Sequence, residues 1–233
     1  MWSIGRKLKN VYTTPYNKGM SKKIIDLSFG EEIGNAVTHG VMALLLLGLL
    51  PVLSVYSYLK MGLLSSIGIS IFIISLFLMF LASTLYHVMA HDSKHKEIMR
   101  ILDHSAIFIA IAGSYTPVAL SIIKGWQGIL VLVIQWSLVV GGIVYKSLTL
   151  KGNKKISLII YLSMGWIAVL FLPKLIENSN FYFVLWIVVG GVMYSIGAWF
   201  YAQKHRPYFH FIWHLFINLA SISHLIAMVF YLN

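Results

Sequence analysis

The chain has 233 residues, of which 59% are hydrophobic and only 11% are charged, and its mean hydropathy is +0.82. A soluble domain carries charge on about a quarter of its residues, so this composition excludes a soluble enzyme, a disordered protein and a secreted disulfide scaffold. Cysteine is absent from the sequence, which excludes thiolate metal ligands and redox pairs. The net charge of +11 fits basic loops at a membrane surface. No groove-reading or aromatic-basic module is present, so we expect no nucleic-acid partner.

The first 30 residues are basic and lack the apolar core of a signal peptide. We therefore expect a cytosolic tail at 1–30 and one membrane domain at 31–233. This domain holds seven apolar stretches long enough to cross a bilayer as helices of about 20 residues. In chain order the stretches are 35–58, 64–89, 101–123, 126–145, 156–176, 181–202 and 209–231. The expected fold is an all-α membrane protein, a bundle of seven transmembrane helices.

Basic residues orient this bundle. Fifteen of the eighteen lysines and arginines fall in the N-terminal tail or in loops on the same side, whereas Lys60, Lys124 and Lys174 fall on the other side. Cytoplasmic loops are enriched in lysine and arginine. The bias predicts a cytoplasmic N-terminus, a C-terminus outside the cell, and a location in the plasma membrane, the inner membrane in a bacterium.

Polar residues interrupt the apolar sequence in four places that this topology puts at one depth. Ionisable groups inside a bilayer are costly, so each is a candidate functional residue. The four segments are Glu32-x-x-Asn35-x-x-Thr38-His39, Ser83-x-x-x-His87, Asp103-His104-Ser105 and His210-x-x-x-His214.

These residue types suit a zinc site. His210 and His214 lie one helical turn apart, about 6 Å along the axis, and can hold one metal ion together, with His87 as a third ligand. Asp103 could then act as general base toward a water molecule at the metal. Ser83 lies one turn from His87 and could bind that water or an oxyanion. The alternative is that these histidines only make hydrogen bonds between helices.

The first of the four segments is expected to support the ligands. Asn35 and His39 are four residues apart and share a helix face. We expect Glu32, Asn35 and His39 to act through hydrogen bonds or packing rather than by ligation.

The remaining polar residues receive other interpretations. His91 and His95 resemble a solvated helix end beside Asp92, Lys94 and Lys96, and His104 is expected to pair with Asp103. His224 lies about 15 Å beyond His214, too far for the same metal, and is expected to be buried and hydrogen-bonded. Three polar residues of the last stretch, Asn218, Ser221 and Ser223, either line a cavity or pack between helices.

Together, the ordered motifs resemble those of the progestin and adipoQ receptor family, and the chain length and the short tail resemble its bacterial, hemolysin III-like branch. The resemblance implies a seven-helix membrane fold and, from the adiponectin-receptor members, a zinc-dependent ceramide hydrolase. It implies zinc ligation by His87, His210 and His214, with Asp103 and Ser83 on the water side. The long N-terminal domain of the receptor members is absent from the given sequence, which argues against recognition of a hormone such as adiponectin.

The leading hypothesis is a zinc-dependent hydrolase that cleaves an amide or ester bond of a membrane lipid whose acyl chain enters from the inner leaflet. Two alternatives stay open. One is a receptor or sensor in which the zinc is structural. The other is a cytolytic protein, although the polar residues gather on one side of the membrane and form no stripe through it.

Overall fold

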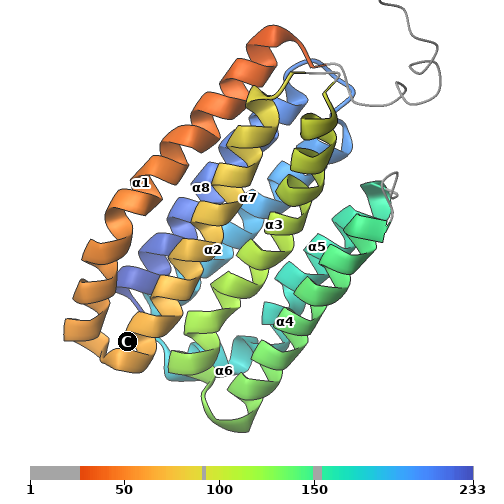
Figure 1. The fold of residues 1–233 in the computed structure, drawn as a ribbon. Coiled ribbons are helices and arrows are strands. Elements are labelled where there is room, and N and C mark those ends of the chain that lie inside the picture. Colours follow the sequence, from red (N-terminus) through yellow and green to blue (C-terminus); the bar gives the residue numbers. More distant parts are fainter. Residues whose placement is uncertain (1–26, 91–92, 149–153, 233) are drawn as a thin grey trace, which may run out of the picture.

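The computed structural model describes residues 27–90, 93–148 and 154–232. These residues form helices and connecting turns without a strand. Seven of the helical segments are long and apolar enough to cross a membrane, which confirms the expected fold class. Figure 1 shows them as one bundle in which α1 begins at one end and the chain finishes at the other. We call the end at which α1 begins the histidine end, because it carries the histidines described below.

Each of the seven expected stretches corresponds to a span of the structure. The ends agree to within a few residues except at the starts of the first and third spans, which come six and seven residues earlier than expected. The bounds are α1 Phe29–Met61, α2 Leu63–Val88, α3 Lys94–Val118, α4 Gly125–Leu148, α5 Lys154–Trp166, α6 Leu172–Asn178, α7 Phe181–Ala202 and α8 Phe209–Phe230. The predicted tail lies outside the described residues up to residue 26.

Helix α1 begins at Phe29, six residues before the predicted start at residue 35. Ser28 caps it, because the Ser28 hydroxyl accepts a hydrogen bond from the Glu31 amide while the Glu31 carboxylate accepts one from the Ser28 amide. This reciprocal arrangement satisfies two donors that a helix N-terminus otherwise leaves free. The apolar pattern missed this turn, and Glu32 consequently lies inside the helix.

Helix α3 is the most deeply buried of the seven spans. It packs against α2 on one side and α4 on the other, while α8 packs between α7 and α1. The contact of α3 with α2 is close at Gly113, where an added Cβ atom would lie within 2.4 Å of the Ser75 side chain. Small residues at such positions let membrane helices approach each other.

The fifth span, expected at 156–176 and found at Lys155–Asn178, is not one continuous α-helix. A 3₁₀ segment at Ile167–Phe171 separates α5 from α6, and Pro173 lies in the first turn of α6. Tyr115 of α3 fastens this break, since its hydroxyl donates to the Gly165 carbonyl (2.6 Å) and accepts from the Ala168 amide (2.8 Å). Backbone groups freed by a break must find partners inside a membrane, and Tyr115 supplies one for each.

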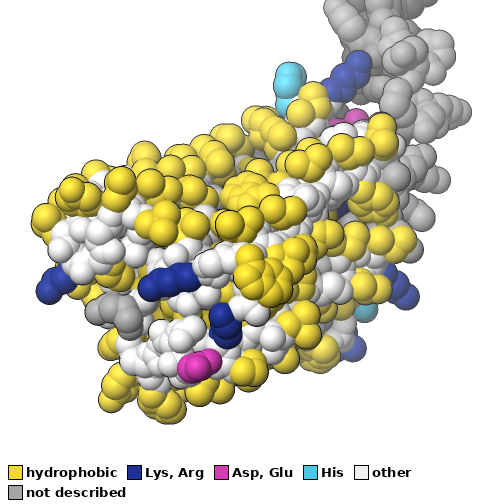
Figure 2. Space-filling model, turned by 90° about the horizontal axis from the view of Figure 1, so that it is seen from below, with side chains coloured by type: hydrophobic (Ala, Val, Ile, Leu, Met, Phe, Trp, Pro, Cys, Tyr) yellow, Lys and Arg dark blue, Asp and Glu magenta, His cyan; other side chains and the backbone are white. Residues whose placement is uncertain are grey.

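The outer surface of the bundle is apolar. Figure 2 shows hydrophobic side chains over most of the visible face, with charged side chains scattered among them. Large residues such as Leu44, Leu59, Val133 and Leu170 are more than half exposed. An apolar exterior around a partly polar interior suits a protein surrounded by lipid tails. The fold therefore positions the polar cluster inside the bundle, at the histidine end.

Candidate metal centre

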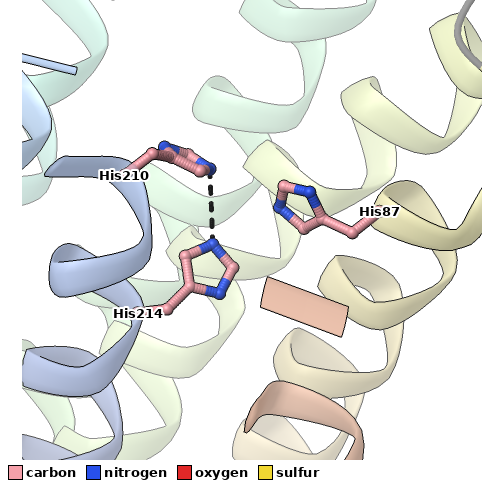
Figure 3. Close-up of side chains that lie close together, drawn as sticks. All are labelled: His87, His210 and His214. Atoms are coloured by element: carbon pink, nitrogen blue, oxygen red, sulfur yellow. Dashed lines mark hydrogen bonds between the residues drawn. The ribbon is translucent and has the colours of Figure 1, made fainter. Parts of the chain in front are cut away.

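Three histidines converge at the histidine end of the bundle. His87 comes from the last turn of α2, and His210 and His214 from the first two turns of α8. Each offers a ring nitrogen, and these nitrogens all lie within 4.8 Å of one another. Figure 3 shows the three rings facing a common space between the two helices. All three side chains are buried, so the structure contains a buried group that could bind a metal ion.

The spacing of the His210 and His214 nitrogens suits a tetrahedral ion. The Nε2 atoms of His210 and His214 are 3.3 Å apart. Two nitrogens bound to one tetrahedral zinc at about 2.0–2.1 Å would be separated by about 3.3 Å. Without a metal, one of these nitrogens can donate its proton to the lone pair of the other; with a metal, both lone pairs would point at the ion.

Several polar atoms around these rings have no hydrogen-bond partner among the described residues, although they are buried. They include Nε2 of His87, Nδ1 of His210 and of His214, both ring nitrogens of His39, and both amide atoms of Asn35. Buried polar groups in native proteins are nearly always satisfied, often by a bound water or ion. A concentration of such atoms in one layer favours a bound metal ion with ordered water.

Glu32 fixes the orientation of His87. Nδ1–H of His87 donates to Oε2 of Glu32 across the α1–α2 interface, at 2.5 Å. Because an ionised carboxylate can only accept, the proton of a neutral His87 lies on Nδ1 and the Nε2 lone pair is left for a ligand. Carboxylate groups bonded in this way to metal-binding histidines are common. The structure thus brings Glu32 to the place expected of a supporting residue.

Lys96 is a residue that the sequence analysis placed wrongly. It was grouped with a solvated helix end, but its side chain is fully buried and its Nζ donates to Oε1 of Glu32 (2.7 Å) and to the Met89 carbonyl (3.1 Å). The error arose because α3 begins at Lys94 rather than near residue 101. Ser93, which caps α3 by accepting from the Lys96 amide, was the signal that could have placed this start.

His39 and Asn35 also join the cluster from α1. The ring of His39 stacks on His214, with centroids 3.7 Å apart, and meets Phe80 edge-on. Asn35 is fully buried one turn earlier on the same face. His39 therefore packs against a potential ligand, which is one of the two arrangements expected for it.

Asp103 and Ser83 border a cavity of about 320 Å³, which none of the three histidines lines. The cavity also touches His39 and then continues between α3, α5, α7 and α8, where its walls are mostly apolar. Trp166 and Val169 on one side and Val188 and Val192 on the other line it while being partly exposed on the outer surface. The cavity is therefore open sideways toward the lipid.

A small hydrogen-bonded group surrounds Asp103. Nδ1 of His104 lies 3.6 Å from Oδ2 of Asp103, and 2.7 Å from the Arg100 carbonyl, to which it can donate. The hydroxyl of Tyr161 donates to the His104 carbonyl, and the Tyr201 hydroxyl lies 3.3 Å from Nε2 of His104. His104 is thus close to Asp103 as expected, but its best hydrogen bond is to its own helix.

Lys204 lies next to this group, in the loop between α7 and α8. Its Nζ sits 3.8 Å from the centre of the Tyr201 ring. Burial lowers the pKa of Lys204 to about 7; the Asp103 carboxylate opposes this shift and the Arg100 guanidinium adds to it. With a pKa of about 7, Lys204 is therefore only partly protonated at physiological pH.

Asn218, Ser221 and Ser223 of α8 do not line the cavity. Asn218 donates to the Thr38 carbonyl (3.4 Å), Ser221 pairs with the Tyr194 hydroxyl (2.9 Å), and Ser223 donates to Leu219 in its own helix. His224 is part-buried with Nε2 placed 3.3 Å from the Ile187 carbonyl, and it does line the cavity. The contact confirms the expectation that His224 is hydrogen-bonded. His95 is exposed, and His91 lies outside the described residues.

Known proteins match most of this chain in sequence. The profile of the family described as Haemolysin-III related matches residues 27–225. The Hemolysin-3 homolog of Bacillus subtilis (strain 168) is 38% identical over 201 residues, covering 86% of this chain and 94% of that protein. Hemolysin-3 of Bacillus cereus is 37% identical over 202 residues, covering 86% and 91%. Monocyte to macrophage differentiation factor of Homo sapiens is 29% identical over 161 residues, 66% of each chain.

Proposed function

Because the chain belongs to the Haemolysin-III related family and buries three histidines within ligand distance of one another, we propose that it is a zinc-dependent hydrolase of amide or ester bonds in membrane lipids. The family match confirms the resemblance drawn from the sequence. The seven apolar helices and the Bacillus relatives indicate a multi-pass protein of the bacterial plasma membrane. The histidine end faces the cytoplasm in this proposal, as the distribution of lysine and arginine predicts.

One observation carries the proposal: a buried three-histidine group packs against His39 through His214, and His39 lines a mostly apolar cavity together with the Asp103 carboxylate and the Ser83 hydroxyl. His87, His210 and His214 would hold the zinc, since three protein ligands are typical of catalytic sites. Bound zinc would supply a Lewis acid and lower the pKa of water. Thiolate ligands are excluded by the lack of cysteine, and imidazoles suit zinc well.

The chain's own residues would carry out the remaining steps. The acyl chain of the lipid would lie among the apolar side chains of α3, α5 and α7, with the scissile carbonyl beside Ser83 and Asp103. Asp103 would accept a proton from the attacking water and return it to the leaving amine or alcohol. Ser83 would donate a hydrogen bond to the oxygen on which charge develops.

The decisive experiment compares Asp103→Asn with His214→Ala in purified protein, using zinc content and untargeted lipid turnover as readouts. We expect Asp103→Asn to keep its zinc while fatty-acid release falls at least about 100-fold, and His214→Ala to lose both. Zinc-loaded wild-type protein that releases no fatty acid from any lipid amide or ester would refute the hydrolase. Stoichiometric zinc in His214→Ala would refute the metal site.

A second candidate function is membrane lysis, which the name of the Bacillus cereus relative, Hemolysin-3, suggests. Dye release from liposomes separates the two candidates. Lysis that persists in both variants would favour a cytolysin, whereas lysis that disappears with Asp103 would make it a consequence of lipid hydrolysis. A zinc that is bound but never exchanges its fourth ligand would instead favour a sensor with structural metal.

A further inference from the structure

Lys96 has no place in the hydrolysis described above, yet it is among the largest fully buried side chains of the protein. Lysine is almost never fully buried unless it is paired, and charges within a membrane protein are expensive and mark function. Replacing a buried ion pair with apolar residues is often neutral or stabilising. Stability alone therefore does not explain why this position is a lysine.

The contacts of Lys96 join three helices at the metal centre. From the first turn of α3, Nζ reaches Oε1 of Glu32 on α1 (2.7 Å) and the carbonyl of Met89 at the C-terminal end of α2 (3.1 Å). It also lies 5.1 Å from the centre of the Tyr86 ring. The Met89 contact holds the end of α2, where His87 is located two residues earlier.

The two oxygens of Glu32 divide their contacts. Oε1 accepts from Lys96, and Oε2 accepts from Nδ1–H of His87. A carboxylate pinned at one oxygen has little freedom to rotate, so its other oxygen stays in the position that orients the His87 ring. The positive charge of Lys96 also favours the ionised carboxylate, the form that accepts from His87 and leaves its Nε2 lone pair available.

We propose that Lys96 is a positioning residue for the metal centre, which acts through Glu32 to hold His87 in its ligating orientation. This inference rests on the metal binding of the proposed function, but not on hydrolysis. Among the described residues, Lys96 makes no hydrogen bond to His87, His210 or His214, and it does not line the cavity. Of its two hydrogen-bond acceptors, only Glu32 is itself bonded to a metal-binding histidine, so an effect that passes through Glu32 can be separated by experiment.

The test is a double-mutant cycle in full-length protein in detergent, with Zn²⁺ affinity measured by competition with a chromophoric chelator. Removing an outer partner of a metal-binding histidine typically costs about 10- to 100-fold in affinity. We expect a loss in that range for Lys96→Met and for Glu32→Gln, and no further loss in the double variant. Lys96→Arg should recover most of the affinity. Lys94→Met is the matched control, because Lys94 is exposed two residues earlier on the same helix, and it should bind like wild type.

A merely structural role would give another pattern. Lys96→Met would then lower the melting temperature without changing Zn²⁺ affinity, or its effect would add to that of Glu32→Gln, and either result overturns the inference. Should Lys96→Met fail to fold, the cycle is completed from Glu32→Gln and the double variant: equal Zn²⁺ affinities support the inference, and a weaker double variant overturns it.

The absorption spectrum of Co²⁺-loaded protein gives a second readout, in which Lys96→Met should perturb the ligand-field bands and Lys94→Met should not. Wild-type protein that binds no metal overturns both proposals, whereas metal binding that depends on Lys96 without lipid turnover refutes only the hydrolase.

Discussion

The imidazole of His39 lies flat against that of His214, with ring centroids 3.7 Å apart and planes inclined by 28°. A stack between aromatic rings contributes about 0.5–1.5 kcal/mol beyond burial, which corresponds to roughly 2- to 10-fold in an equilibrium constant. His39→Ala should therefore weaken Zn²⁺ binding by about this factor, measured by chelator competition. His39→Phe keeps a flat ring and should retain most of the affinity. If neither variant binds zinc, His39 is a ligand and not a packing residue.

Helices α7 and α8 meet closely at Gly190. A Cβ atom there would lie 2.2 Å from Cδ2 of His224 and 3.2 Å from the Ala220 carbonyl oxygen. Gly190→Ala should destabilise the protein by about 1–3 kcal/mol through overpacking, observed as a lower melting temperature in detergent. His224→Ala should relieve much of this loss in the double variant. Gly191→Ala is the control, because a Cβ atom at Gly191 meets open space; an equal loss there would contradict the explanation.

The same open space at Gly191 allows the cavity to be filled. Gly191 lines the cavity on the α7 side, and a Cβ atom there meets open space. Gly191→Phe should place a ring where the acyl chain is proposed to lie, and misplacing a substrate by about 1 Å can cost roughly 100-fold in rate. We expect fatty-acid release to fall at least about tenfold while zinc content is unchanged. Undiminished release of long-chain products would place the substrate elsewhere.

Lys204 should make stability depend on pH. Its pKa is lowered from 10.5 to about 7 in the folded protein, so between these two values the unfolded chain binds a proton that the folded chain does not. The contribution of Lys204 to the free energy of unfolding therefore increases as the pH rises through that interval. Below pH 7 the cost of burying the charged amine is fully present. Partial exposure of the side chain reduces the effect.

The comparison of wild type with Lys204→Met isolates this contribution. From pH 7 to pH 9 the melting temperature of the wild type should rise relative to the variant by ~2–4 °C, the shift that about 1 kcal/mol produces in a chain of this size. Parallel curves for the two proteins would show that Lys204 has an ordinary pKa. Arg206→Met serves as the control, because Arg206 lies in the same loop and does not titrate in this range.

Long apolar runs made most of the fold predictable. A membrane imposes helices of one length on such runs, and the matching depth of His87, His210 and His214 followed from the alternation of helix direction. The structure brings these three residues together, and Glu32, His39, Ser83 and Asp103 lie around them.

The features that the sequence concealed depend on contacts between distant segments. In the sequence, Lys96 stands beside Lys94 and Glu97 and resembles a solvated residue. In the structure, the ion pair with Glu32 from α1 compensates the cost of burying its charge. The 3₁₀ break at Ile167–Phe171 occurs in apolar sequence without a glycine, and it depends on Tyr115 from another helix. Hydropathy averages over such single contacts and so cannot reveal them.

Tyr115 connects the fifth span, which lines the cavity, to the helix that carries Asp103. It holds the break in the fifth span through Gly165 and Ala168, and both of these residues line the cavity. Tyr115 stands on the same helix as Asp103, twelve residues further along. If lipid enters the cavity as proposed, an outward movement of the fifth span would stretch these two hydrogen bonds, which end on the helix that carries Asp103.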